Sequence, residues 1–303
     1  MIKSITVTNY IGESIILELT RPEKSGFIIK SVDGLGPAKA NVNMTTLAAT
    51  DGNKYNSAFL DQRDLVFNLE FYQTATETIE DIRHKSYRYF PIKKKAHFVI
   101  ETDNRVVETD GYVEANEPNI FSNTEGCTIT VICPDPWLYS RVTTETVFSG
   151  INPIFEFPFE NDSLTEPLLE LSTIETKTEQ TVYYAGDAEV GISIRMYAIG
   201  DVSNITIYNV TTREHLYINT DKLTEITGAG LGKGDTINIE TRKGNKSITL
   251  LRDGKKINIL NCLNKGNDWF TLTKGDNIFA YVAESGSTNL QFCISHKVIY
   301  EGV

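Results

Sequence analysis

Apolar and polar side chains alternate over short stretches in the first half of the chain. Residues 15–19 and 65–71 carry an apolar side chain at every second position, which is the period of a strand with one buried face. A stretch rich in turn-forming residues, 33–53, lies between them. The pattern predicts short strands joined by loops.

One helical pattern interrupts these strands at residues 74–90. Thr74 followed by Glu77 has the spacing of a capping box, and Ile79 and Ile82 continue an apolar face at helical spacing. Pro91 ends the pattern, because proline cannot continue a helix.

Two strand-like runs, 96–101 and 105–109, follow the expected helix. A short polar turn joins them, so we expect a hairpin. A later run, 127–133, leads into Pro134-Asp135-Pro136, where two residues without backbone donors force the chain out of a sheet.

The second half of the chain is almost purely strand-like. Apolar and alternating runs recur at spacings of roughly 8–15 residues with Gly, Asn and Asp between them, which is typical of a β-sandwich. These runs are residues 190–196, 204–208, 236–240, 247–251, 256–260, 278–282 and 290–294.

The strand pattern weakens between the two halves, where Pro153 and Pro158 occur. A chain of 303 residues is also near the upper limit of a single core. We therefore expect a mainly β protein with an N-terminal domain at 1–145, a linker at 146–165 and a C-terminal β-sandwich domain at 166–303.

The composition argues against several functions. The formal net charge is -11, spread over both halves, whereas a protein that grips nucleic-acid phosphates needs a basic stripe. No secretory signal and no apolar run long enough for a membrane span is visible. We expect synthesis in a reducing cytoplasm and four free cysteines; Cys127 and Cys133, on one expected strand, lie about 20 Å apart and cannot bridge each other.

Candidate chemistry is sparse. The glycine-rich stretch 228–234 lacks the spacing of a phosphate-binding loop, because Thr227 occupies the position of the first glycine. The four histidines show no metal-ligand spacing with one another or with cysteine, and no Gly-x-Ser-x-Gly elbow occurs. We expect no catalytic residue, no metal and no cofactor, and a protein that is not an enzyme.

Two features are candidates for contacts with other molecules. Lys93, Lys94, Lys95 and His97 form the one concentrated basic run, which would face an acidic neighbouring subunit or a nucleic acid, or be a solvated hairpin base. Trp269 is the candidate for a glycan contact, although tryptophan more often anchors a core.

Four stretches, in order along nearly the whole chain, resemble the distal tail protein family of siphophages, a hub component of the phage tail baseplate. The resemblance lies in Asp33-Gly34-Leu35-Gly36 with 51–55, Arg63 and the strand 65–71; in 131–137, which ends in Pro134-Asp135-Pro136-Trp137; in Gly186-Asp187-Ala188-Glu189 with the strand after it; and in 268–277 with the terminal 300–303. The aromatic after Pro136 is a Trp where the family more often has Tyr.

The resemblance implies a fold and an assembly. The N-terminal domain would be a tail-tube-like β-sandwich or split barrel with one α-helix and a hairpin, here 96–109, that reaches toward a neighbour. The C-terminal domain would be a galectin-like β-sandwich. A homo-hexameric ring would surround the DNA channel, and DNA would pass without specific binding.

The implied function is that of a structural virion component that joins the tail tube to the baseplate or host-adhesion device. Implied partners are the tail-tube protein, a tail-associated hub or lysin protein and a receptor-binding protein, and the location is the host cytoplasm before assembly and the virion tail tip afterwards. The alternative is a carbohydrate-binding module that aids adhesion to the host cell wall. For the C-terminal sandwich the sequence favours protein contacts, or a domain that only decorates the hub, over glycan binding, because it shows no clear exposed aromatic platform.

Overall fold

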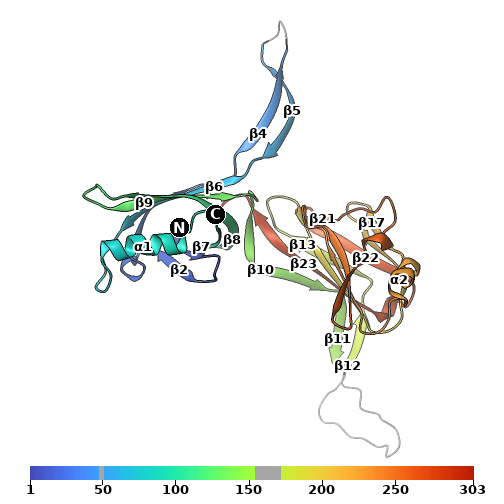
Figure 1. Ribbon diagram of the computed structural model, residues 1–303. Helices are drawn as coiled ribbons and strands as arrows, with labels where there is room; N and C mark the ends of the chain where they lie inside the picture. The colour runs from blue at the N-terminus through green and yellow to red at the C-terminus, as the bar shows by residue number, and fades with distance from the viewer. Residues whose placement is uncertain (48–50, 154–171) are drawn as a thin grey trace, which may run out of the picture. The chain divides into compact units, whose positions relative to one another are not determined.

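The computed structural model describes residues 1–47, 51–153 and 172–303, and the chain forms two compact units (Figure 1). Unit 1 comprises Met1–Val142 and Ile299–Val303, and unit 2 comprises Thr143–Val298. The prediction of a mainly β protein is confirmed.

The boundaries found in the structure differ in detail from the predicted ones. The last residues of the chain belong to unit 1, although the sequence assigned them to the C-terminal domain. Most of the predicted linker, 146–165, lies outside the described residues. Its described part holds the end of β10 (Leu138–Val147) and β11 (Ser149–Pro153), which pairs with β12 (Ser172–Thr176). The domain limits at 145 and 166 stay predictions.

Unit 1 consists of two sheets that share one long strand. The first has the order β2-β1-β7-β8, and the second has the order β3-β6-β9-β8. The strands are β1 (Ile2–Thr8), β2 (Ser14–Glu18), β3 (Phe27–Asp33), β6 (Arg63–Phe71), β7 (Lys95–Thr102), β8 (Val106–Asn119) and β9 (Gly126–Cys133), and a short 3-10 helix, η1 (Pro22–Lys24), precedes β3.

The strand β8 changes partner at its middle. Residues before Tyr112 pair with β7, and residues after it pair with β9. At this point Gly111 lies so close to β9 that a Cβ atom would come within 2.5 Å of Val131 Cγ1. Glycine therefore permits the close approach that brings the two sheets together.

The core of unit 1 lies between these sheets and under α1 (Ile79–Tyr89), from which Ile82 is fully buried. The predicted helix is present, but its start was wrong. Thr78 and Asp81 form the capping box, while Glu77 N donates to Thr74 Oγ1 in a turn before the helix. Both threonines satisfy backbone donors, and the sequence signature did not distinguish them.

The strands β4 (Ala40–Thr46) and β5 (Asn53–Leu60) form a hairpin that projects from the body of unit 1 (Figure 1). From its turn-forming residues, most of this stretch was expected to form loops. The predicted hairpin, β7–β8, does form, but Ala96, Phe98 and Ile100 of β7 are buried in the core. The projecting element of unit 1 is therefore β4–β5.

Unit 2 is a β-sandwich. One sheet has the order β10-β23-β15-β18-β19-β20, and the other has the order β13-β22-β16-β17. A short pair, β14 (Val190–Gly191) with β21 (Thr271–Leu272), lies beside them. The remaining strands are β13 (Glu179–Tyr184), β15 (Ser193–Ala198), β16 (Ser203–Asn209), β17 (Glu214–Ile218), β18 (Thr236–Glu240), β19 (Ser247–Arg252), β20 (Lys255–Asn258), β22 (Gly275–Ser285) and β23 (Leu290–Tyr300).

Alternating residues of the two sheets form the core of unit 2, including the stacked rings of Tyr281 and Phe292, whose centroids are 5.0 Å apart. The likeness of this sandwich to galectins stays a prediction. A helix that the sequence analysis missed, α2 (Thr220–Thr227), precedes the glycine-rich stretch and ends at Gly228 in the left-handed conformation. Two 3-10 helices, η2 (Leu260–Cys262) and η3 (Ser287–Asn289), complete the unit. No helix in the described part of the chain is long and apolar enough to cross a membrane.

Candidate functional site

A buried arginine donates hydrogen bonds to backbone carbonyls of three segments of unit 1 that are distant in sequence. Arg63 is 2% exposed, and its Nε and Nη2 atoms donate to the carbonyl oxygens of Pro136 and Glu301, each at 2.7 Å. Its Nη1 atom donates to the carbonyl oxygens of Gly34 and Gly36. Burial lowers the pKa of the Arg63 guanidinium, and the four carbonyls compensate part of that desolvation.

This junction contains residues from three of the four stretches that carried the family resemblance. The turn at Gly34 is fixed by sterics as well as by Arg63, because its φ is +86° and a Cβ atom would lie 1.9 Å from the carbonyl oxygen of Asp64. The resemblance thus includes positions that hold unit 1 together rather than positions that contact a ligand.

The β4–β5 hairpin presents an apolar face that no other part of the described chain covers. The pairs Ala40–Leu60, Val42–Ala58 and Met44–Tyr55 share this face. Met44 is 55% exposed and Tyr55 is 61% exposed. We call this set the arm face.

The opposite face of the hairpin is mainly polar, although Phe59, opposite Asn41, is 53% exposed on it. Asn43 Nδ2 donates to Ser57 Oγ at 3.1 Å, and Asn56 Nδ2 donates to Thr45 Oγ1 at 2.6 Å. The register shift after Asn43 lets both Ser57 and Asn56 point to this side. The hairpin is therefore amphipathic, although both of its faces are exposed in the single chain.

The predicted basic contact residues lie together at the start of β7, where part of their charge is neutralised within unit 1. Lys95 Nζ lies 2.9 Å from Asp110 Oδ2, and His97 Nδ1 lies 2.9 Å from Asp110 Oδ1. These partners lower the pKa of Asp110 to about 2, chiefly through the hydrogen bond from His97. Lys94 Nζ lies 5.2 Å from the ring centroid of Tyr10, and Lys93 adopts a φ of 66° in the turn before β7.

The predicted glycan contact, Trp269, is half-buried beside β21 and carries Lys246 Nζ at 5.4 Å from its ring centroid. Its neighbours Phe270 and Leu272 are fully buried, as expected for the opposite strand face. Whether Trp269 contacts a glycan, and whether the basic residues contact a neighbour, stay predictions.

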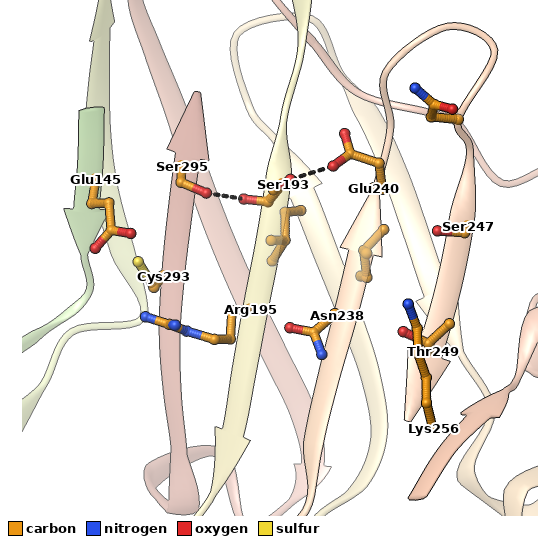
Figure 2. Close-up of a pocket in the computed structure, with 13 residues that line it drawn as sticks. Glu145, Ser193, Arg195, Asn238, Glu240, Ser247, Thr249, Lys256, Cys293 and Ser295 are labelled. Carbon is orange, nitrogen blue, oxygen red and sulfur yellow. Dashed lines mark hydrogen bonds between the residues drawn. The ribbon is translucent and has the colours of Figure 1, made fainter. Parts of the chain in front are cut away.

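A polar groove lies on the face of the first unit 2 sheet that points away from the core (Figure 2). Its volume is about 440 Å³. Trp269 does not line it. The groove is defined by Glu145, Ser193, Arg195, Asn238, Glu240, Asn245, Ser247, Thr249, Lys256, Cys293 and Ser295, with the backbone of Ile194 and Ile239 beneath.

Among the charged groups of this groove, Glu240 forms an ion pair, with Arg242. Glu240 accepts hydrogen bonds from Arg242 Nε and Nη2 at 2.7 and 2.8 Å and a further one from Ser193 Oγ. Burial alone would raise the pKa of Glu240, but these hydrogen bonds outweigh it and lower the pKa. The Arg195 side chain contacts the thiol of Cys293.

Neither a metal-ligand cluster nor a reactive thiol is present among the described residues. They contain no cluster of three or more His, Cys, Asp or Glu side chains able to hold a metal ion. The four cysteines are free and buried, which confirms that prediction. Burial raises the pKa of Cys127 to about 12 and that of Cys133 to about 11, so neither thiol is an activated nucleophile.

The fold is that of phage tail hub proteins, and solved structures of that class match the chain over nearly its whole length. The chain is similar to the Dit protein of phage SPP1, which is described as a paradigm of the hub adsorption apparatus in phages that infect Gram-positive bacteria. The two share 13% identity and a TM-score of 0.66, with 98% of this chain and 99% of Dit covered. It is also similar to a chain of the phage P2 baseplate in its activated conformation, at 10% identity and a TM-score of 0.53, with all of both chains covered.

No known protein family's profile matches the sequence, and no curated protein matches it either. The resemblance to distal tail proteins is confirmed as a likeness of fold. Neither the arm face nor the groove was predicted from the sequence. The arm face had a visible signal, because Ala40, Val42 and Met44 alternate with Asn41 and Asn43.

Proposed function

We propose that the chain is a structural component of a phage tail tip: a distal tail protein whose copies form a homo-hexameric ring that joins the tail tube to the baseplate or host-adhesion device. The observation that carries the proposal is a fold shared with SPP1 Dit over 98% of the chain.

The arm face supplies the contact between copies. A two-stranded hairpin is marginally stable by itself in water, and its exposed Val42, Met44 and Tyr55 gain stability when another surface covers them. In a ring each copy would lay its arm face on the next copy, because a heterologous interface that closes gives a ring.

Charge supports the same arrangement. Lys93 and Lys94 have no carboxylate partner within 4.0 Å in the described residues, while the chain as a whole carries a formal net charge of -11. These lysines would face acidic residues of a neighbouring copy or of the tail-tube protein. Acidic residues along the channel would let DNA pass without holding it. A hub or lysin protein and a receptor-binding protein would complete the device at the virion tail tip, after folding of the chain in the host cytoplasm.

Native mass spectrometry and negative-stain electron microscopy test the proposal, on the chain alone and mixed with the tail-tube protein encoded by the same phage. We expect rings with the mass of a hexamer in at least one of these samples. A chain that stays monomeric in both samples at micromolar concentration would refute the proposal.

A further inference from the structure

The groove on unit 2 is lined by side chains that, among the described residues, are nearly all polar and come from neighbouring strands of one sheet. Figure 2 shows Arg195 extending toward Cys293 and Glu145 at one side, with Asn238, Thr249 and Lys256 on the strands beside it. The register places Arg195 opposite both Cys293 and Asn238, and Asn238 opposite Thr249. These groups therefore form a continuous row across four strands.

Several of these groups have unused binding capacity. Among the residues that the structure describes, no oppositely charged partner lies within 4.0 Å of Arg195, Lys256 or Glu145. The side-chain amide of Asn238 makes no hydrogen bond to the described residues either. Glu240 is already paired with Arg242. Two cations and one carboxylate thus remain, so the unpaired charge of the groove is positive in a chain that is acidic overall.

The donor and acceptor pattern indicates the kind of ligand. Asn238, Asn245, Ser247 and Thr249 can each both donate and accept, as the hydroxyl groups of a sugar do. The planar guanidinium of Arg195 matches a carboxylate or a phosphate with two parallel hydrogen bonds. The volume of about 440 Å³ is within the range of small-ligand sites.

A peptide fits this groove less well. The strands β15, β18 and β19 are each paired on both sides, so they offer no free edge to which an extended peptide could add. The apolar residues beneath the groove, Ile194 and Ile239, are 1% exposed, because their side chains point into the core. No apolar pocket is left for a peptide side chain.

We propose that this groove binds a saccharide that carries a carboxylate or a phosphate, with Arg195 holding the anionic group and Asn238, Thr249 and Lys256 holding neighbouring oxygens. This differs from what the sequence favoured for the C-terminal sandwich, because the described residues that line the groove include no aromatic side chain on which a sugar could stack. The inference does not depend on ring formation.

The full-length chain is tested on an array of neutral, carboxylated and phosphorylated oligosaccharides. Isothermal titration then follows with oligogalacturonate and with a galactose oligomer of the same length, which lacks the carboxylates. We expect binding of anionic members only, weakened by roughly tenfold or more in Arg195→Ala, as for the loss of hydrogen bonds to a charged group. Lys274→Ala removes the same charge from an exposed turn of unit 2 outside the groove and should bind as the unmodified chain does.

NMR locates the contact. The Arg195 Nε–H and Asn238 side-chain amide signals should shift with the bound ligand, and circular dichroism checks that the Arg195→Ala chain is folded. Absence of binding to every sugar on the array would overturn the proposal, as would equal binding of the neutral and anionic oligomers. Unchanged affinity in a folded Arg195→Ala chain, or saturable binding to a peptide array alone, would overturn it as well.

Discussion

The Nη2 atom of Arg63 donates a hydrogen bond of 2.7 Å to the carbonyl oxygen of Glu301, 238 residues further along the chain. This contact returns the C-terminus to unit 1, which also holds the N-terminus. The last residues of the chain therefore pack as part of unit 1.

Replacing Arg63 should destabilise unit 1 strongly. Arg63→Ala removes a buried side chain and leaves four part-buried carbonyl oxygens without its donors, and we expect a loss of about 2–4 kcal/mol in the free energy of unfolding. Urea unfolding followed by Trp137 fluorescence in a Trp269→Phe background measures this, because Trp137 is then the sole tryptophan. The control Arg21→Ala removes a 57% exposed side chain and should change the free energy by less than about 0.5 kcal/mol. Equal stabilities of the two variants would contradict the role given to Arg63.

Gly34 and Gly36 offer a matched pair in one turn. Gly34→Ala places a Cβ atom 1.9 Å from the Asp64 carbonyl oxygen at a φ of +86°, whereas Gly36→Ala meets no atom within 4 Å. We expect Gly34→Ala to cost about 2 kcal/mol or more and Gly36→Ala to be nearly neutral. Thermal unfolding of both variants decides this, and a similar midpoint for the two would mean that the turn relaxes freely.

The sequence predicted the parts of the fold that local rules determine. The alternation of apolar and polar residues identified β6, β9 and most strands of unit 2, because each has one buried face. Pro91 correctly marked where the helical segment that contains α1 ends. The capping box was placed at Thr74 instead of Thr78, because both positions carry a threonine followed three residues later by an acidic residue.

The remaining features depend on contacts that are distant in sequence. Nothing local indicates that the Arg63 side chain meets residues 34, 136 and 301. The groove likewise arises from pairing of strands that are distant along the chain, so Arg195 and Glu145 become neighbours of Cys293 only after folding. The family resemblance implied that the hairpin at 96–109 reaches toward a neighbour, but alternate residues of this hairpin are buried in the core.

The ion pairs of Asp110 predict a specific pH dependence. Its pKa is lowered from 3.8 to about 2 in the folded chain, so its contribution is fully present above the unfolded value and is lost as the pH falls through about 2. Because Asp110 is half exposed, we expect at most about 1 kcal/mol. Asp110→Asn should therefore be less stable than the unmodified chain at pH 7, with the difference shrinking toward pH 2. Urea unfolding at both pH values tests this, and a difference that grows in acid would exclude the assignment.

The four cysteines should be unreactive in the native chain. Burial raises the pKa of Cys127 to about 12 and that of Cys133 to about 11, so the thiolate that attacks a reagent is scarce at pH 8. We expect slow labelling by a disulfide reagent in buffer, and complete labelling of all four thiols in denaturant without reductant. Fewer than four free thiols in freshly prepared, denatured protein would demonstrate a disulfide that the fold does not contain.

The arm face predicts which substitutions stop assembly without harming the fold. Val42→Asp and Met44→Asp place charges on the exposed apolar side of a hairpin, so the monomer should keep its unfolding midpoint within a few degrees. A neighbouring copy that covers this side would then have to bury an unpaired carboxylate, which is costly, so ring formation should fail. Asn41→Asp adds the same charge to the opposite face and is the matched control. Native mass spectrometry of the three variants compares the oligomeric fractions. Rings that persist in both Val42→Asp and Met44→Asp, or that are lost equally in Asn41→Asp, would show that copies meet through another surface.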